Sequence, residues 1–497
     1  MSTPSKQRVA VIGAGVAGLV SAKVLKQDGF DVTVFEKAST MGGVWAKSRA
    51  YPGLRTNNPR ETYAFSDFDY PETADEFPTA EQVRAYLEAY AEHFGITPHI
   101  RLGTEVISVA RRRAESSLSH PGFRVEVQPG EDAAAPEVHD VDWVVVCNGV
   151  FSVPHIPQLQ GQETFAGWVF HSSQLSHPEI IRGQRVIVVG AGKSALDCAT
   201  FAAHEAASST LVFRKPHWMV PRYFGDIRVD RVLFNRFSEQ IFPTYHSASS
   251  LERALRWGAT PLIGLWKMTV SYVVKRLSHI PDAMVPAIAA TDGLENNGIG
   301  AEFYGVLQQG LVHIKSAQIV AYSGPDTVQL DTGEQLEADG VIFATGWQQR
   351  ISFLSADLLQ KIQKEGWFQL YRHILPPEEP NLGFIGYAAS GNTPLTAEIS
   401  AHWLSQWFRG ELKLPDSTEM EREIAKVRRW TQAVFPRRHE GYFIGAYISH
   451  YIDQLMQDMG LPTHRTDNWF SEYWGPFWAS RYRSLAKERQ QLRINCP

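Results

Sequence analysis

The sequence predicts an α/β fold made of two similar units, the second inserted into a discontinuous first and carrying a helical insertion. Three observations lead to this prediction. A β-branched run meets a glycine turn and a helical pattern near the N-terminus, and the same order returns after about 180 residues. Strand patterns follow each repeat, and the last part of the chain is mostly helical. We therefore expect the chain to leave the first unit, form the second and then return.

Each unit has the order strand, helix, strand. In the first unit, the strand Arg8–Ile12 is followed by a helix over Ala17–Asp28 and a strand at Asp31–Phe35. The second unit repeats this order over Arg185–Val189, residues 194–208 and Leu211–Phe213. Strands joined by such a helix lie parallel, which is the Rossmann-like dinucleotide-binding arrangement. Two such units predict two nucleotides, or one nucleotide and a decayed copy.

The first glycine turn, GAGVAG, predicts a site for FAD or NAD. Gly13 permits the tight turn, Gly15 lets the backbone approach a pyrophosphate, and Gly18 allows the helix to pack closely on the strand. The helix N-terminus adds unpaired N–H groups and partial positive charge. Glu36 follows the next strand, where a carboxylate accepts hydrogen bonds from a ribose diol and repels a 2′-phosphate. The site therefore suits FAD or NAD and disfavours NADP.

The second glycine turn, GAGKSA, predicts a site for NADPH. Gly190 and Gly192 take the places of the first two glycines, and Ser194 can donate to a phosphate. The following strand ends in Arg214 and Lys215, where the first unit has an acidic residue. A guanidinium matches a 2′-phosphate with paired, charge-assisted hydrogen bonds. The alternative for both cations is an ordinary solvated strand end.

The patterns also predict where the units begin and end. We expect residues 1–158 to form the first part of the FAD-binding domain and residues 159–335 to form the NADPH-binding domain. Residues 336–497 return to the FAD-binding domain and add the C-terminal helices. Within the second domain, residues 223–291 lack glycine-turn chemistry and have a helical pattern, so they predict a helical insertion or lid.

Composition narrows the class of protein. A chain of 497 residues with 44% hydrophobic and 20% charged residues is typical of a multi-domain globular enzyme. A net charge of -5, with no basic run longer than Arg111 to Arg113, argues against nucleic acid as a partner. Cys147, Cys198 and Cys496 are too scattered for a disulfide framework or a metal site, which favours a cytoplasmic setting.

Two membrane-related segments are not expected. The first residues, MSTPSKQ, run directly into a strand pattern, so we expect no secretory leader. The segment Trp257–Val274 contains two glycines, a proline and a lysine, which favour a buried or interfacial helix over a membrane span. Contact of the insertion with a membrane surface stays open, as does a homodimer.

With both nucleotide sites placed, the chain resembles the class B flavoprotein monooxygenases, closest to the flavin-containing monooxygenases. The resemblance covers nearly the whole chain and rests on GAGVAG, GGVW at Gly42 to Trp45, FAGWVFHSSQL at Phe165 to Leu175, GAGKSALD and FATGW at Phe343 to Trp347. It implies FAD and NADPH as cofactors and O₂ as co-substrate. It further implies cofactor contacts from Gly43, Trp45, Thr56, His171, Thr345 and Gly346. The family signature ends in an aromatic residue where this chain has Leu175.

The stretch YPGLRTNNPRETYAFSDF indicates the type of oxygenation. It resembles flavin-containing monooxygenases of the amine and sulfide type, which implies that the Asn57 amide contacts the oxygen-reactive part of the flavin or NADP. The resemblance implies an oxygen adduct at flavin C4a and transfer to nitrogen or sulfur of a small organic substrate. Baeyer-Villiger oxygenation of a ketone is the alternative, but the arginine of those enzymes is absent from the run Ala289 to Asp292.

Other functional classes share the two-nucleotide architecture. A flavoprotein disulfide reductase needs a cysteine pair beside the flavin, and the three cysteines lie far apart in the sequence. An NADPH oxidase or a non-catalytic FAD-binding protein remains the alternative from another class, because the motifs indicate binding more directly than turnover.

Overall fold

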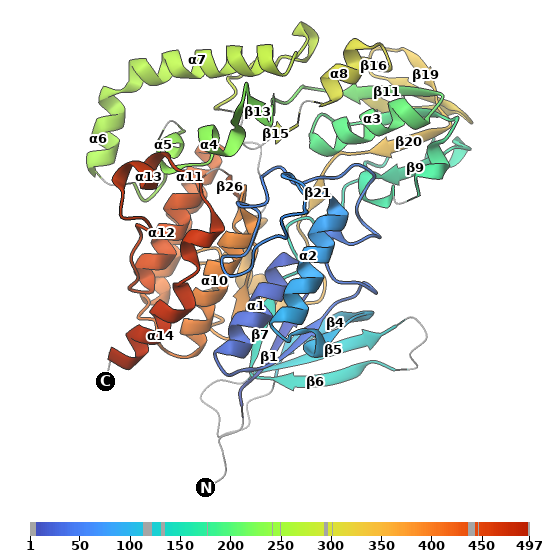
Figure 1. Cartoon of the computed structure of the whole chain (residues 1–497). Coiled ribbons are helices and arrows are strands. Elements are labelled where there is room, and N and C mark those ends of the chain that lie inside the picture. Colours follow the sequence, from blue (N-terminus) through green and yellow to red (C-terminus); the bar gives the residue numbers. More distant parts are fainter. Residues whose placement is uncertain are drawn as a thin grey trace.

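Two five-stranded parallel sheets form the centre of the molecule, one in the lower half of Figure 1 and one at its upper right. The computed structural model describes residues 6–112, 122–130, 135–175, 177–240, 242–248, 250–292, 297–300, 302–435, 443–445 and 447–495. Arg113 and Cys496 therefore lie outside the described residues.

The first sheet contains strands from both ends of the chain. Its strand order is β24-β7-β1-β2-β3, and all neighbours are parallel. The strands are β1 (Arg8–Ile12), β2 (Asp31–Phe35), β3 (Ile100–Arg101), β7 (Trp143–Val146) and β24 (Leu382–Phe384). Because β24 comes after the whole second sheet in the sequence, the first unit is discontinuous. This confirms the predicted fold class.

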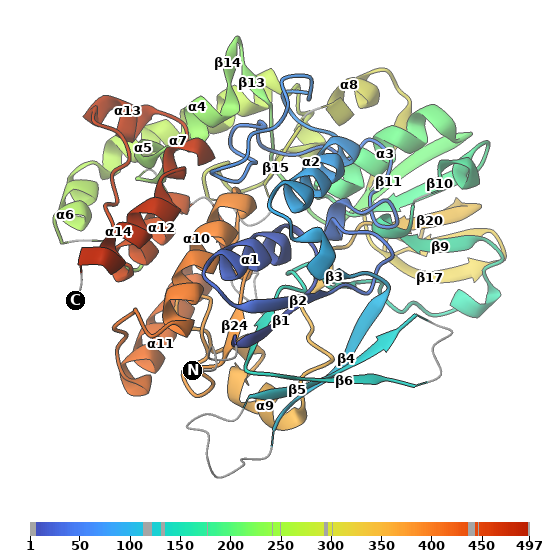
Figure 2. The same ribbon diagram turned by 60° about the horizontal axis from the view of Figure 1, so that its bottom comes forward.

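Helices pack on one face of the first sheet, and an antiparallel sheet packs on the other. Val9 and Val11 on one face of β1 pack against α1 (Val16–Gln27) and α10 (Thr393–Phe408). Ala10 and Ile12, whose side chains point to the other face, pack against an antiparallel sheet (Figure 2). That sheet consists of β4 (Thr104–Arg111), β5 (Phe123–Pro129) and β6 (Glu137–Val141). Burial on both faces explains why β1 is almost continuously apolar.

The second sheet repeats this arrangement. Its order is β16-β11-β10-β20-β9, again parallel, with α3 (Lys193–Glu205) and α8 (Glu302–Gln308) on one side. The strands are β9 (Trp168–His171), β10 (Arg185–Val189), β11 (Ser208–Phe213), β16 (Val312–Ser316) and β20 (Gly340–Phe343). An antiparallel sheet of β17 (Ile319–Gly324), β18 (Thr327–Leu330) and β19 (Gln335–Glu337) covers the other side.

Two chain segments connect the units. The outgoing segment contains β8 (Val153–Pro154), and the returning segment contains β21 (Trp347–Gln348), which pairs with it antiparallel. β20 pairs with β10 and β9, so the second sheet continues past residue 335, where the sequence placed the domain boundary. The division at residues 158 and 335 stays a prediction.

The insertion and the C-terminal region are mainly helical. Between β12 (Met219–Val220) and its partner β15 (Gly298–Ile299), the described residues form a short hairpin and four α-helices. These are β13 (Tyr223–Phe224), β14 (Ile227–Arg228), α4 (Val229–Leu233), α5 (Arg236–Glu239), α6 (Ser250–Gly258) and α7 (Thr260–Leu277). The other helices are α2 (Ala80–His93), α9 (Ala356–Ile362), α11 (Ser417–Val434), α12 (Ile448–Asp458), α13 (Trp469–Trp474) and α14 (Leu485–Asn495). None of the helices formed by described residues combines the length and apolarity needed to cross a bilayer.

Two elements differ from what the local pattern alone indicates. The apolar run Val141–Val146 has the pattern of one continuous strand, but it is divided because the chain passes from β6 in the antiparallel sheet to β7 in the parallel sheet. The turn lies at Asp142, whose carboxylate accepts a hydrogen bond of 2.7 Å from the Arg8 N–H. The second difference is β11, which begins at Ser208, three residues before the expected start, because α3 already ends at Glu205.

Candidate nucleotide-binding sites

Gly13 and Gly18 of the first turn occupy positions that a side chain could not share. Gly13 has φ of +108°, and a Cβ atom on Gly18 would lie 1.8 Å from the Gly13 carbonyl oxygen. Gly15 faces Gly43, whose own Cβ would lie 3.2 Å from the Gly15 Cα. The two backbone segments therefore form a narrow cradle at the start of α1. Gly43 forms the side of this cradle opposite Gly15, and it is the first residue of a single 3₁₀ turn, Gly43–Trp45.

Among the residues that the structure describes, no side chain caps either of the two helices that begin at the glycine turns. Gly15 precedes α1 and Gly192 precedes α3, and neither helix has an acidic residue in its first turn. By contrast, Thr79 caps α2 and Asp416 caps α11 through backbone N–H groups. The free N–H groups and the positive end of the helix dipole suit an anion such as pyrophosphate. Both helix starts therefore fit a dinucleotide.

Glu36 lies beside the first glycine turn, at the end of β2. Its carboxylate is 8% exposed and accepts hydrogen bonds from the Ala14 N–H at 2.7 Å and the Ala38 N–H at 2.9 Å. A carboxylate has about four acceptor positions, so both oxygens keep capacity for another donor. The geometry fits a ribose diol held next to the cradle.

The second site carries the opposite charge. Gly190 has φ of +140°, and a Cβ atom there would lie 2.5 Å from the Ala344 carbonyl oxygen. Arg214 and Lys215 directly follow β11, and both side chains are exposed. Within the part of the chain that the structure describes, no carboxylate pairs with either cation. Both remain available to a phosphate.

Tyr51 connects the two units at the second site, a contact that the sequence analysis missed. Its buried hydroxyl donates to Asp197 of α3 at 3.0 Å, and Lys193 forms an ion pair with the same carboxylate. Burial and the Asp197 carboxylate raise the pKa of Tyr51, so the phenol stays neutral and can donate. Ser194 also hydrogen-bonds Tyr51. The YPG segment is thereby tied to the start of α3.

His171 ties β9 to the returning segment. It is fully buried, and its Nε2 lies 3.0 Å from the Gly346 carbonyl oxygen, while the Ser173 N–H donates to its Nδ1. A carbonyl oxygen only accepts, so Nε2 carries the hydrogen of a neutral ring. Burial lowers the pKa of His171, which keeps the ring neutral. Thr345, on the returning segment, donates to the carbonyl oxygen of His155 on the outgoing segment.

Some buried polar groups near Thr56 and Asn57 have no hydrogen-bond partner among the described residues. Thr56 is 1% exposed and its hydroxyl has no hydrogen-bond partner among the described residues, whereas Asn57 is exposed. The buried Asn58 amide donates to the Gly391 carbonyl oxygen at 2.5 Å. The next residue, Asn392, directly precedes α10 and is 1% exposed, and neither of its side-chain amide atoms has a partner within the described structure. Buried polar groups are normally satisfied, so these positions fit a polar ligand.

Tryptophan side chains are divided between the core and the surface. Trp45 is 7% exposed and donates to the Tyr63 hydroxyl at 2.9 Å, and Trp218 is 3% exposed. Trp257, Trp266 and Trp469 are exposed instead. Cys147 directly follows β7 of the first sheet, and Cys198 lies in α3 of the second unit. Both are buried free thiols, and they do not form a redox pair with each other.

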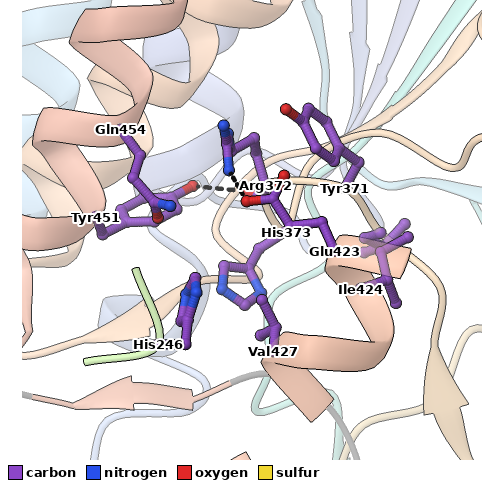
Figure 3. Close-up of a pocket in the computed structure, with 10 residues that line it drawn as sticks. His246, Tyr371, Arg372, His373, Glu423, Ile424, Val427, Tyr451 and Gln454 are labelled. Atoms are coloured by element: carbon purple, nitrogen blue, oxygen red, sulfur yellow. Dashed lines mark hydrogen bonds and ion pairs between the residues drawn. The ribbon is translucent and has the colours of Figure 1, made fainter. Parts of the chain in front are cut away.

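A small cavity lies between the insertion and the C-terminal helices (Figure 3). His246 and His373 lie side by side in it, and Arg372 pairs with Glu423 at its wall. Its volume of about 10 Å³ is room for about one water molecule. This cavity is therefore too small to hold an organic substrate.

Because of these two histidines, we expect the free energy of unfolding to fall in mildly acidic solution. Burial lowers the pKa of His246 and of His373 to about 3, from 6.5. Between these values the unfolded chain binds more protons than the folded one, so stability falls as the pH falls below 6.5. Replacing His246 by glutamine should reduce the loss between pH 7.5 and 5.5 by about 1.4 kcal/mol.

Urea unfolding of both proteins at the two pH values measures this difference. Buried Glu398, whose pKa burial raises to about 7, acts with the opposite sign. Its contribution cancels in the comparison, because both proteins contain it. An equal loss in parent and variant would contradict the assignment to His246.

Comparisons with known proteins agree with this geometry. The family model described as "Flavin-binding monooxygenase-like" matches residues 6–464, so the chain belongs to the flavin-binding monooxygenase-like family. This confirms the resemblance to class B flavoprotein monooxygenases and makes the protein a flavoprotein. "Probable flavin-containing monooxygenase 1" of Arabidopsis thaliana is 29% identical and covers 98% of each chain.

Two solved structures share the fold. S-allyl-L-cysteine S-oxygenase from Allium sativum has a TM-score of 0.62 and 21% identity, covering 99% of this chain and 94% of that one. Cyclohexanone monooxygenase from Rhodococcus sp. Phi1, bound to NADP⁺, has a TM-score of 0.68 and 20% identity, covering 91% and 97%. These similarities concern the fold alone.

Proposed function

We propose that the protein is an NADPH- and O₂-dependent flavin monooxygenase that oxygenates a small organic substrate at a nitrogen or sulfur atom. The observation that carries the proposal is the charge contrast between the two nucleotide units. Glu36 follows β2 in the first unit, whereas Arg214 and Lys215 follow β11 in the second. The contrast supports FAD at the first site and NADPH at the second, since a carboxylate repels a 2′-phosphate and a guanidinium binds it.

The residues at the FAD site would hold and enclose the cofactor. The cradle of Gly15 and Gly43 would receive the pyrophosphate, and Glu36 would accept from the ribose. Thr56 and Asn392, whose buried polar groups have no partner among the described residues, would face polar atoms of the flavin. When bound, the flavin supplies the reaction with O₂. The protein's own work is to orient both nucleotides and exclude water.

The residues at the NADPH site would orient the nicotinamide donor. The start of α3, with Gly190, Gly192 and Ser194, would bind the pyrophosphate, and Arg214 and Lys215 the 2′-phosphate. Tyr51 would hold this helix start against the FAD unit through Asp197. The two segments that connect the units would be held together by His171, Thr345 and Gly346. A neighbour in the comparisons, cyclohexanone monooxygenase, was solved with NADP⁺.

Asn57 supports transfer to a heteroatom. Its amide is neutral and exposed beside the buried Thr56 and Asn58, so it offers hydrogen bonds without adding charge. No arginine occurs in the run Ala289 to Asp292; Asp292 forms an ion pair with Lys267. A neutral surrounding favours the protonated, electrophilic form of reactive oxygen, which soft nucleophiles attack.

Baeyer-Villiger oxygenation of a ketone is the second candidate. The specific observation in its favour is the fold likeness to cyclohexanone monooxygenases, with a TM-score of 0.68 for the NADP⁺-bound form. We further propose a cytoplasmic setting, which the free thiols of Cys147 and Cys198 support.

Turnover of a sulfide, a tertiary amine and a cyclic ketone tests the proposed reaction. With NADPH and O₂ present, we expect the sulfide or the amine to give the monooxygenated product fastest. Exclusive formation of a lactone would overturn the heteroatom assignment. Rapid mixing of the reduced protein with O₂ separates the remaining class, because an NADPH oxidase returns directly to oxidised flavin without a preceding transient species.

Substitution of Asn57 tests its role. Asn57→Leu should still bind FAD and oxidise NADPH, but should release hydrogen peroxide in place of product, because the amide no longer donates near the reacting oxygen. Asn57→Gln, which keeps the amide, is the matched control and should retain more coupling. The peroxide formed per NADPH oxidised measures the effect. Full coupling in Asn57→Leu would remove Asn57 from the reaction.

A further inference from the structure

A buried group of charged side chains lies between α1 and α10, the two helices that pack together on one face of the first sheet (Figures 1 and 2). Lys23 of α1 and Glu398 of α10 are each 1% exposed. Lysine and glutamate are rarely buried this deeply unless they have partners that compensate the lost hydration. The partners of these two residues therefore indicate what the group does.

Glu398 binds the segment of chain that carries Asn57. Its Oε2 accepts a hydrogen bond of 2.7 Å from the Ser66 N–H, and its Oε1 accepts one of 2.7 Å from the Ser66 hydroxyl. The same segment meets the start of α10 at a second point, where Asn58 donates to the Gly391 carbonyl oxygen. Asn57 directly precedes this second point. The position of Asn57 therefore depends on how the segment lies along α10.

Lys23 binds the residue that follows Ser66. Its ammonium group donates to the Asp67 carboxylate at 2.5 Å. Residues 56–67, called here the 56–67 segment, are thus tied to α10 through Ser66 and to α1 through Asp67. Helix α1 begins at the first glycine turn. The two ties connect the segment to both helices whose starts form the proposed flavin site.

The Glu398 carboxyl lies close to the balance between its two protonation states at neutral pH. Burial and the nearby Asp67 carboxylate raise the pKa of Glu398 to about 7. Lys23 and the two hydrogen bonds from Ser66 act in the opposite direction, because they favour the charged form. The contact with Ser66 is therefore linked to the protonation state of Glu398.

The neighbouring titratable groups stay in one state over the same pH range. Tyr86 and Tyr90 of α2 also interact with Glu398, and burial raises the pKa of both phenols well above 10.0, so they remain neutral. His402 lies one turn further along α10 and hydrogen-bonds Arg489 of α14. Burial and Arg489 lower the pKa of His402 well below 6.5, so this ring is neutral as well.

We propose that Glu398 is a positioning residue of the flavin site, because its carboxylate fixes the 56–67 segment through Ser66. Hydrogen bonds to an ionised carboxylate are roughly twice as strong as neutral ones. Protonation of Glu398 therefore loosens the segment without releasing it. The inference rests on the proposed function, which places Thr56 and Asn57 of this segment at the flavin.

Glu398→Gln reproduces the protonated state at every pH. The amide oxygen can accept from the Ser66 N–H while the amide NH₂ donates to the Ser66 hydroxyl, as the neutral carboxylic acid would. The side chain keeps its size, so the packing of α10 is retained. The variant thereby separates the charge of residue 398 from its volume.

The rate of FAD release from the flavin-loaded protein tests the inference without turnover. After dilution, the rise in flavin fluorescence follows the release at pH 6 and at pH 8.5. We expect the parent to release FAD roughly fivefold faster at pH 6, because the hydrogen bonds to Ser66 lose their charge assistance. Glu398→Gln should release FAD at the faster rate at both pH values. Loss of the pH dependence is the result that a merely structural role would not produce.

Glu379→Gln is the matched control. Glu379 is also fully buried, and it pairs with Arg111 and Lys361. It lies just before the start of β24, whereas the glycine turn follows the end of β1, and these are opposite edges of a parallel sheet. The control should lower the melting temperature but keep the pH dependence of the parent. The same pH dependence in Glu398→Gln would overturn the inference.

Ser66→Ala identifies the group that titrates. It removes the hydroxyl that favours the charged form of Glu398, so the midpoint of the pH dependence should move to higher pH. An unchanged midpoint would assign the titration to another group and overturn the inference. A protein that takes up no FAD would overturn the proposed function together with this inference, whereas FAD release that is independent of pH in the parent would overturn this inference alone.

Discussion

Replacing Gly18 by alanine should abolish flavin binding. The added Cβ would lie 1.8 Å from the Gly13 carbonyl oxygen, so either α1 or the glycine turn must move. Both partners are backbone, and forced overpacking of this kind costs about 3 kcal/mol. The displaced turn would no longer present the helix N-terminus to the pyrophosphate. Flavin absorbance of the purified protein, per chain, measures the outcome.

Gly305→Ala is the matched control for this substitution. Gly305 also lies in a helix, α8, but a Cβ there would meet no atom within 4 Å. Alanine should therefore leave flavin content unchanged and stabilise the helix by up to about 1 kcal/mol. If Gly18→Ala kept its full flavin content, the role of the first turn in cofactor binding would be refuted. Circular dichroism of both variants separates a lost cofactor from a lost fold.

Replacing Arg214 by alanine should erode the preference for NADPH over NADH. A hydrogen bond to a charged group contributes about 1.5 to 3 kcal/mol, equivalent to roughly 10- to 150-fold in the ratio of kcat/KM values. The reason is that the exposed guanidinium has no carboxylate partner in the described structure and can pair with the 2′-phosphate. Steady-state kinetics with both nucleotides measure the ratio.

Lys215→Ala serves as the comparison for Arg214. A lysine forms a single-point contact, whereas an arginine can bind a phosphate through two parallel hydrogen bonds. Removal of Lys215 should therefore change the preference for NADPH less than removal of Arg214. An unchanged preference in Arg214→Ala would refute the assignment of the 2′-phosphate to this strand end. A larger effect of Lys215→Ala would exchange the two roles.

The sequence predicted the elements that local patterns determine. The bounds of β1, β2 and β10 agree with the expected strands, because β-branched runs end sharply at glycine turns. The ends of β2 and β11 also agree with the expected ones, and they place Glu36 and Arg214 at corresponding strand ends. The chain's return to the first sheet through β24 confirms the discontinuous first unit.

Contacts between distant segments could not be read from the sequence. Tyr51 meets Asp197, and Asn58 meets Gly391, across separations of 146 and 333 residues. Such pairs depend on how the two units and α10 pack, and no local periodicity encodes this. Likewise, the burial of individual aromatic residues depends on this packing: the fold buries Trp45 against Tyr63 and exposes Trp257 on the surface.

The central claim is that one chain holds two nucleotides in separate sites of opposite charge. Calorimetric titration of NADP⁺ into the flavin-loaded protein, with the flavin spectrum recorded in parallel, tests it most directly. We expect one equivalent of NADP⁺ to bind while the flavin stays in place. Displacement of the flavin by NADP⁺, or a purified protein that takes up no FAD, would contradict the claim.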